Sequence, residues 1–216
     1  MYHILVSDDH PLFQNAISGV IKSRYPDAKI ATSNDLDSTI SSLERNADID
    51  LLLLDLHMPG SQDLFGLILV RDKFPSVPVA ILSADENLNT VNRAMGHGAC
   101  GYIPKSCPPE TIQGALQSIL DGEHWLPPGV EEQLSPLQHE ELDLAGRVAT
   151  LTPQQYKVLC YLREGWLNKQ IGYEIGVTEA TVKAHITAIF KKLGISNRTQ
   201  AVIILGKMSL EKPTDE

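Results

Sequence analysis

The sequence predicts a doubly wound α/β domain with a five-stranded parallel sheet, followed by a small all-α domain of four helices. Over residues 1–122, short apolar segments alternate with helical segments, as in a parallel sheet covered on both faces. Near the C-terminus, a short helical segment, a glycine and a longer helical segment form a helix-turn-helix pattern. Residues 1–126 hold 8 Lys and Arg against 16 Asp and Glu, whereas residues 151–208 hold 8 against 3. This change from net −8 to net +5 indicates two domains, the second facing a polyanion.

The central strand of the sheet is predicted over residues 49–54, an apolar segment without alternation that is too short to span a membrane. It ends at Asp55, and Pro59-Gly60 then turns the chain. The other strands are expected at residues 2–6, 28–32, 77–82 and 99–103. The helices between them are expected to begin near Pro11, Leu36, Leu64, Glu86 and Pro108. In the first helix, the stripe expected to face the sheet comprises Leu12, Ala16, Ile17, Val20 and Ile21.

Polar side chains follow four of the predicted strands. Asp8 and Asp9 follow the first strand, Asp55 the third, Ser83 the fourth and Lys105 the fifth. In a doubly wound sheet these carboxyl ends meet at one rim. Each residue alone is equally compatible with a helix cap or a surface charge, but together they favour a functional site.

The chemistry of this rim follows from its charges. Three neighbouring carboxylates repel one another unless a cation joins them, and an oxygen-only site with room for water suits Mg²⁺. A metal ion beside a carboxylate suits phosphoryl transfer, with Asp55 as the nucleophile. Ser83 and Lys105 would supply a hydroxyl and a positive charge to the bound phosphoryl group.

Residues 1–125 resemble the receiver domain of two-component response regulators, which has a flavodoxin-like fold. The motifs that carry the resemblance are Asp8-Asp9-His10-Pro11, Asp55-Leu56-His57-Met58-Pro59-Gly60, Leu82-Ser83-Ala84 and Gly101-Tyr102-Ile103-Pro104-Lys105-Ser106. The resemblance implies that Asp55 accepts a phosphoryl group from a sensor histidine kinase. It implies that Mg²⁺ is the cofactor, bound by Asp8, Asp9, Asp55 and the backbone carbonyl of His57. It also implies that Ser83 and Lys105 contact the phosphoryl group and that Tyr102 reorients on activation.

One segment departs from this family pattern. Residues 61–65 stand where relatives often have a shorter, glycine-bearing passage into the third helix. The following Gly66 is expected to cost that helix roughly 1 kcal/mol relative to alanine. The shape of this loop is therefore the least predictable part of the rim.

The second half begins with a predicted linker at residues 126–147, which is acidic and contains Pro127-Pro128-Gly129. The second domain is predicted over residues 148–210. Its first helix should begin at Thr152, the N-cap, with Pro153 in the first turn.

The remaining helices of this domain are delimited by polar caps and a glycine. Asn168 is expected to cap a short second helix, which ends before a turn at Gly176. Thr178 is expected to cap a third helix that runs to about Lys192, and a fourth begins near Arg198. The inward stripe of the third helix comprises Val182, Ile186, Ile189, Phe190 and Leu193.

The opposite face of the third helix is small, polar and basic. Its residues are Thr181, Lys183, Ala184, Thr187 and Lys191. A helix with such a face suits entry into the major groove of DNA, although the lysines alone would also describe a solvated surface.

Residues 151–206 resemble the LuxR-type DNA-binding domain. The motifs that carry the resemblance are Leu151-Thr152-Pro153, Glu164-Gly165, Asn168-Lys169-Gln170-Ile171, Thr181-Val182-Lys183-Ala184-His185 and Lys191-Lys192-Leu193-Gly194-Ile195-Ser196-Asn197-Arg198-Thr199. It implies that Lys183, Ala184 and Thr187 face bases. The implied neighbours of DNA phosphates are Asn168, Lys169, Thr181, Lys191 and Arg198. His185 lies nearer the buried side and is interpreted as structural.

Together the two resemblances point to the NarL/FixJ class of response regulators, whose members bind promoter DNA and regulate transcription. We expect a cytoplasmic protein without membrane contacts that forms a homodimer when phosphorylated and is not an enzyme in the usual sense. One alternative is a phosphohydrolase with an aspartyl-phosphate intermediate. That class usually has a carboxylate two residues after the nucleophile, where this chain has His57. The other alternative is a DNA-binding protein whose receiver no longer switches, against which the complete acidic set argues.

Overall fold

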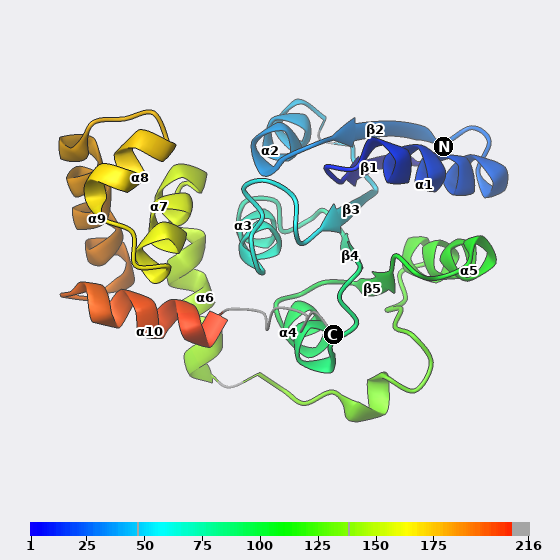
Figure 1. Ribbon diagram of the computed structural model, residues 1–216. Coiled ribbons are helices and arrows are strands. Elements are labelled where there is room, and N and C mark those ends of the chain that lie inside the picture. The colour runs from blue at the N-terminus through cyan, green and yellow to red at the C-terminus, as the bar shows by residue number, and fades with distance from the viewer. Residues whose placement is uncertain (47, 138, 209–216) are drawn as a thin grey trace. The chain divides into compact units, whose positions relative to one another are not determined.

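The computed structural model describes residues 1–46, 48–137 and 139–208 (Figure 1). The chain divides into two compact units. The first contains the described residues up to Leu137, and the second contains those from His139 to Met208. No helix among the described residues has the length and apolar character needed to cross a bilayer.

The first unit is built on a parallel sheet with the strand order β2-β1-β3-β4-β5. Its strands are β1 (His3–Ser7), β2 (Lys29–Ser33), β3 (Leu51–Asp55), β4 (Val79–Ser83) and β5 (Gly101–Pro104). All neighbouring strands pair in parallel. The predicted strands are confirmed. Each begins one or two residues later than expected and ends one residue later, so that β3 includes Asp55 and β4 includes Ser83.

Helices cover both faces of this sheet, as the alternation of elements predicts. The helices are α1 (Pro11–Arg24), α2 (Leu36–Arg45), α3 (Phe65–Lys73), α4 (Leu88–Gly96) and α5 (Pro109–Leu120). Figure 1 shows α1 and α5 on one face and α2, α3 and α4 on the other. Side chains of α1 and α5, including Ile17, Ile21 and Leu116, pack with Val6 and Leu53 of the sheet in one buried cluster. Both faces of β3 and β4 are buried, which explains their unbroken apolar sequence.

The inward stripe predicted for α1 is wrong at two positions. Leu12 is 85% exposed and Ala16 is also exposed, whereas Gln14 takes a buried place. The Gln14 side-chain amide donates hydrogen bonds to the backbone carbonyls of Asp8, at 2.5 Å, and Ser33, at 2.9 Å. Because these bonds satisfy its amide nitrogen, a glutamine can fill a buried position that the pattern did not assign to it.

The second unit contains the helices α6 (His139–Ala149), α7 (Pro153–Arg163), α8 (Asn168–Glu174), α9 (Glu179–Leu193) and α10 (Arg198–Met208). Thr152 caps α7 and Thr178 caps α9, each accepting a hydrogen bond from the backbone three residues on, as predicted. The predicted cap at Asn168 is wrong: the N-cap of α8 is Leu167, which offers no polar side chain.

The turn between α8 and α9 is tight. Gly176 has φ +70°, a conformation that side chains other than glycine rarely adopt. A β-carbon on Gly172 would lie 2.7 Å from the Val177 carbonyl oxygen, so this helix can approach the turn only with a glycine there. These two glycines set the helix-turn-helix geometry that presents α9.

The segment predicted as a linker contains regular structure. Trp125, just before it, pairs with Gly101 at the edge of the sheet, and Glu131–Gln133 form a short 3₁₀ helix, η1. Within the first unit, the Ser135 backbone donates a hydrogen bond to Asn92 of α4. The last part of the segment belongs to α6, whose Leu144 and Val148 are buried in the second unit.

Candidate functional sites

The carboxylates predicted at the rim come together at the ends of β1 and β3. Asp8 and Asp55 are buried, with 0% and 2% exposure, and Asp9 is half-buried beside them. Ligand-type atoms of Asp8, Asp9, His10 and Asp55 all lie within 4.8 Å of one another. The convergence follows from the strand order, because β1 and β3 are neighbours in the sheet.

Lys105, at the end of β5, crosses the rim to reach both buried carboxylates. Its Nζ lies 2.7 Å from Asp8 Oδ2 and 2.9 Å from Asp55 Oδ2. Burial of Lys105 disfavours its charged form, but the neighbouring carboxylates of Asp8 and Asp55 outweigh burial and raise its pKa above the ordinary value. The lysine therefore offsets the repulsion between the two carboxylates.

His10 is a member of this cluster that residue-by-residue reasoning did not single out. Its Nδ1 lies 2.7 Å from Asp9 Oδ1 and 3.1 Å from Asp8 Oδ1, and its backbone N–H donates to Asp8 Oδ1 at 2.8 Å. Its place directly after the two aspartates was the only available signal. His10 thus orients the Asp8 carboxylate and also contacts Asp9.

The rim fits a hard cation. Within the described part of the chain, the buried oxygens Asp8 Oδ2 and Asp9 Oδ1 accept no hydrogen bond of good geometry. Each faces a nitrogen at short range instead, Lys105 Nζ for the first and His10 Nδ1 for the second. Closely spaced carboxylate oxygens are the ligands that Mg²⁺ and similar hard ions prefer.

Ser83 and Tyr102 are joined through Asp85, another residue not singled out from the sequence. Ser83 Oγ accepts a hydrogen bond from the Asp85 backbone N–H at 3.1 Å. The Tyr102 hydroxyl donates to the Asp85 carbonyl at 2.5 Å, and the Thr90 hydroxyl of α4 donates to Asp85 Oδ2 at 2.6 Å. Tyr102 is completely buried, and burial raises its pKa. The loop after β4 thus connects the rim, α4 and Tyr102.

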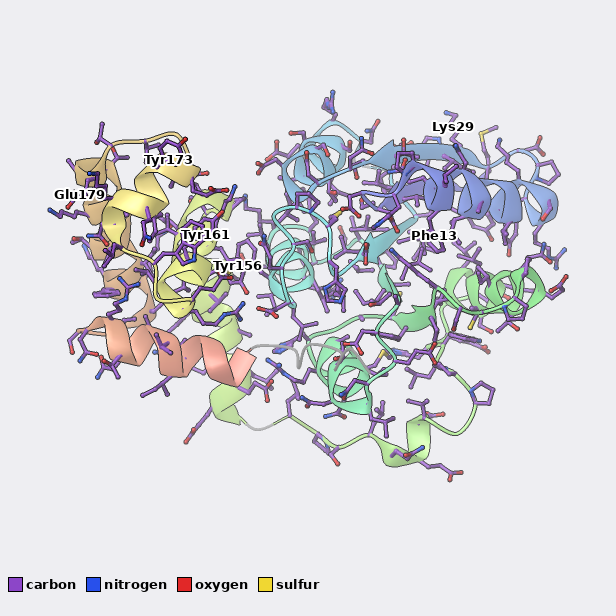
Figure 2. All side chains as sticks on the ribbon, viewed as in Figure 1. Phe13, Lys29, Tyr156, Tyr161, Tyr173 and Glu179 are labelled. Carbon is purple, nitrogen blue, oxygen red and sulfur yellow. The ribbon has the colours of Figure 1, made fainter. Side chains whose placement is uncertain are left out.

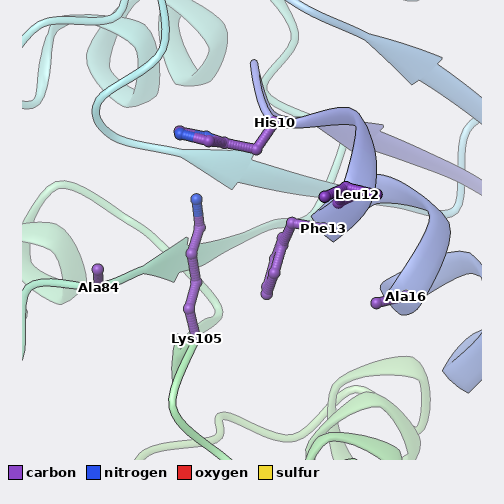
Figure 3. A pocket seen from close by; sticks show the side chains of 6 residues that line it. All are labelled: His10, Leu12, Phe13, Ala16, Ala84 and Lys105. Carbon is purple, nitrogen blue, oxygen red and sulfur yellow. The ribbon is translucent and has the colours of Figure 1, made fainter.

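An open pocket of about 510 Å³ lies beside the rim, lined by His10, Leu12, Phe13, Ala16, Ala84 and Lys105 (Figure 3). Lys105 Nζ lies 4.8 Å from the centre of the Phe13 ring. The exposed Leu12 and Ala16, which do not pack on the sheet, form its outer wall. The aliphatic part of Lys105 therefore lines the apolar pocket, while its ammonium group reaches the acidic cluster.

In the second unit, most residues predicted to contact DNA lie on the exposed face of α9. Thr181, Lys183, Ala184, Thr187 and Lys191 are all exposed. Of the five predicted inward residues, Val182, Ile189 and Leu193 are buried, and Ile186 and Phe190 are half-buried. His185 is half-buried.

Lys183 and Thr187 already have partners along the helix. Lys183 Nζ lies 2.9 Å from Glu179 Oε1, and the Thr187 hydroxyl donates to the Lys183 carbonyl at 3.0 Å. Lys169, on α8, is exposed, and Asn168 beside it is half-buried. These side chains come from both helices of the helix-turn-helix, with α9 supplying the larger share.

Other cations of the second unit bind backbone carbonyls at helix ends. Arg198 donates to the Trp166 carbonyl at 2.5 Å and the Leu162 carbonyl at 3.3 Å, although it was predicted to lie next to a phosphate. Lys192 donates to the Thr150 carbonyl at 2.6 Å. Arg147 of α6 donates to the Leu193 carbonyl, at the end of α9, at 2.8 Å. Cations in the last turn of a helix stabilise its unpaired carbonyls.

Comparison with known families identifies both units. Residues 4–117 match the model of the response regulator receiver domain, and residues 149–205 match the model of bacterial regulatory proteins of the luxR family. The chain belongs to the response regulators that carry a LuxR-type DNA-binding domain. It is a response regulator of a two-component system, and proteins of this class bind DNA and regulate transcription.

Individual relatives are similar over nearly the whole chain. The glycerol metabolism activator of Pseudomonas putida is 41% identical over 95% of this chain and 96% of its own length. The nitrate/nitrite response regulator NarL of Escherichia coli K12 is 32% identical, covering 93% of each chain. The structure of RcsB from Salmonella enterica bound to promoter rprA, with the phosphomimetic BeF3−, shares the fold with a TM-score of 0.57 and 20% identity. That match covers 97% of this chain and 100% of RcsB.

Proposed function

We propose that Asp55 is the phosphoacceptor and that its phosphorylation by a sensor histidine kinase controls binding of α9 to promoter DNA. The observation that carries the proposal is the convergence of Asp8, Asp55 and Lys105 at the carboxyl ends of three strands, where Lys105 Nζ lies 2.7 Å from Asp8 and 2.9 Å from Asp55. A carboxylate that is buried beside a cation suits nucleophilic attack on a phosphorus atom, and the apolar pocket lined by Lys105 lies next to the rim. His57, rather than a carboxylate, stands two residues on, which favours a stable acyl phosphate over rapid hydrolysis.

We infer that Mg²⁺ is the resident ion, held by the carboxylates of Asp8, Asp9 and Asp55 and by the backbone carbonyl of His57. When bound, the ion neutralises charge on the transferring phosphoryl oxygens. Lys105 then provides a positive charge to the phosphoryl group from the side of β5. Ser83 provides its hydroxyl, and Tyr102 responds through the Asp85 backbone that both residues contact.

For the second unit, we propose that Lys183, Ala184 and Thr187 contact bases. Thr181, Lys191, Lys169 and Asn168 lie next to phosphates in this scheme. The proposal rests on the exposure of these residues on α9 and α8, apart from the half-buried Asn168, and on the net +5 charge of residues 151–208. The protein would act in the cytoplasm, where kinase and DNA are both accessible, and as a homodimer when phosphorylated. It turns over no substrate beyond the single phosphoryl transfer.

The domain boundary proposed here differs from the one expected from the sequence. Because α6 packs through Leu144 and Val148 into the second unit, we place the start of the DNA-binding domain at this helix. The linker then shortens to the segment that follows Trp125 and precedes α6.

The phosphoacceptor is tested by incubating the full-length protein with a small phosphodonor and Mg²⁺. Wild type should take up one phosphoryl group, measured by intact mass, and Asp55→Asn should take up none. The exposed Asp72→Asn in α3 is the matched control, because it removes the same charge outside the rim. Equal uptake by wild type and Asp55→Asn would reject the assignment.

A further inference from the structure

The first turn of α9 carries an acid on its exposed surface. Glu179 Oε1 lies 2.9 Å from Lys183 Nζ, and the two side chains are 48% and 65% exposed. Glu179 lies on the outer surface of the second unit, on the helix that the proposed function assigns to base contacts (Figure 2). The first residues of a recognition helix are those that approach base edges most closely. An acid at this point opposes the negative field of DNA, so its presence there needs a reason.

The chemistry of the pair is well defined. The hydrogen bond from Lys183, with its charge, lowers the pKa of Glu179, so the carboxylate is ionised and can only accept hydrogen bonds. Lys183 Nζ has three N–H donors, and the contact with Glu179 uses one of them. The pair therefore presents an acceptor and a donor side by side, 2.9 Å apart.

The major-groove edge of a C·G base pair has the complementary arrangement. Cytosine offers its N4 amino group as a donor, and guanine offers O6 and N7 as acceptors. N4 and O6 are joined by a Watson–Crick hydrogen bond and so lie about 2.9 Å apart. The spacing of the Glu179–Lys183 pair matches the N4–O6 spacing. The carboxylate would face the amino donor of cytosine, and the ammonium would face the O6 acceptor of guanine.

We propose that Glu179 is a specificity-determining residue that accepts a hydrogen bond from cytosine N4, while Lys183 binds O6 and N7 of the paired guanine. This inference rests on the proposed function of α9 as the base-reading helix. A reversed G·C pair would place the carboxylate against O6 and the ammonium against the amino group. An A·T pair with adenine facing Glu179 keeps a donor and an acceptor but loses N7 beside Lys183 and adds the thymine methyl. The order of preference is therefore C·G, then A·T, then the reversed pairs.

A purely local role for the ion pair makes different predictions. Pairs of this kind at i and i+4 on an exposed helix stabilise the helix slightly, and an acid in the first turn favours the helix dipole. Removing such an acid would change binding to every DNA sequence equally. A base-reading acid instead weakens binding to all DNA by repulsion while discriminating at one base pair.

The test uses the full-length protein activated with beryllofluoride. Selection from randomised duplexes first identifies the preferred sequence for wild type, Glu179→Ala, Lys183→Ala and Glu164→Ala. Glu164 is exposed at the end of α7, and its substitution removes the same charge away from α9. Affinity is then measured on the preferred duplex, on one with the C·G pair reversed, and on one with N4-methylcytosine or 7-deazaguanine at that pair.

Wild type and Glu164→Ala should lose about 5- to 150-fold in affinity when the pair is reversed, the range expected for a specific base contact. N4-methylcytosine should weaken binding of wild type about tenfold and leave Glu179→Ala within twofold, since the methyl group blocks only the carboxylate. Glu179→Ala should also bind random duplexes more tightly than wild type. 7-Deazaguanine should affect wild type and not Lys183→Ala.

Two results would overturn the inference, and they are distinguishable. If Lys183→Ala changes the base preference while Glu179→Ala keeps the wild-type preference and the wild-type response to N4-methylcytosine, Glu179 does not read a base. If neither substitution changes any preference, α9 is not the reading helix, and the proposed assignment of DNA contacts fails with it.

Discussion

At the acidic rim, Asp8, Asp55 and Lys105 lie at the carboxyl ends of three strands, with Lys105 Nζ within 2.9 Å of both carboxylates. On α9, the side chains proposed to contact DNA come from one helix and mostly contact only their helical neighbours. The first arrangement is buried, so its charges interact strongly and removing one leaves the others uncompensated. The second is solvated, so each charge contributes little until DNA displaces the water. Single substitutions should therefore change stability at the rim and change selectivity or salt dependence on α9.

The largest effect on folding is expected at Lys105. Lys105→Met should lower the free energy of unfolding by about 3 kcal/mol in metal-free buffer, because Asp8 and Asp55 are then buried without a cation. Mg²⁺ should stabilise the variant more than it stabilises wild type. Chemical denaturation with and without the ion measures both, with the exposed Lys73→Met of α3 as control. Equal stability of Lys105→Met and wild type in chelator would contradict this account of the rim.

The contribution of Lys105 to the free energy of unfolding should fall as pH rises. The pKa of Lys105 is raised in the folded protein by Asp8 and Asp55, against the opposing effect of burial. Its stabilising contribution is therefore fully present below the pKa of the unfolded lysine, about 10.4. It is lost as pH rises through the higher pKa of the folded state, so wild type and Lys105→Met should converge in stability only in strong alkali.

The next prediction concerns Gly66, where helix propensity and packing predict opposite effects on stability. Helix propensity alone predicts that Gly66→Ala stabilises α3 by roughly 1 kcal/mol. In the structure, a β-carbon at Gly66 would overlap the buried side chain of Ser61, so the substitution should instead cost about 1–3 kcal/mol. Gly114 of α5 is the control, because a β-carbon there meets nothing within 4 Å and Gly114→Ala should stabilise. Thermal unfolding of the two variants in opposite directions is the expected result, and two stabilised variants would refute the packing argument.

Gly66 shows which features a sequence can and cannot reveal. Strand order, the burial of both faces of β3 and the meeting of strand ends follow from patterns of a few residues, so the positions of Asp8, Asp55 and Lys105 at one rim were predictable. The role of Gly66 depends on the loop of residues 61–64 before α3, which has no periodic pattern and in which Asp63 has the unusual φ of +54°. Its contact with Ser61 could not be deduced from helix propensity.

The same limit applies to the polar residues whose roles were missed. Asp85 directly follows Ser83-Ala84, but only the folded loop shows that its carbonyl and carboxylate bind Tyr102 and Thr90. Arg147 lies at the end of the segment predicted as a linker, and α6 forms there because Leu144 and Val148 are buried in the second unit. Tertiary contacts decide these positions, and the local sequence does not encode them.

On α9, smaller and more selective effects are expected. If Lys183 binds a base, Lys183→Ala should cost about 1–3 kcal/mol on the preferred duplex and relax the preference at one position. If Lys191 lies next to a phosphate, Lys191→Ala should weaken binding to all duplexes alike and reduce the salt slope by about 1. Titrations of one preferred and one random duplex at several salt concentrations distinguish the two. Identical behaviour of the two variants would remove the distinction between base and phosphate contacts on this helix.

The smallest effect on DNA binding is expected at Arg198. This residue tests most directly whether a cation binds backbone carbonyls within the protein or a DNA phosphate outside it. The sequence resemblance places this residue next to a phosphate, but its guanidinium is half-buried and donates to the carbonyls of Trp166 and Leu162. A guanidinium held by backbone acceptors should release no counterion from DNA, because that release requires direct neutralisation of a phosphate. Arg198→Ala should therefore leave the salt slope at the wild-type value while lowering the free energy of unfolding by about 1–3 kcal/mol, since two carbonyls lose a charged donor. Lys191→Ala, exposed on α9, is the matched charge change and should do the reverse. A drop of about 1 in the salt slope of Arg198→Ala, with stability unchanged, would mean that this arginine turns outward to a phosphate when DNA is bound.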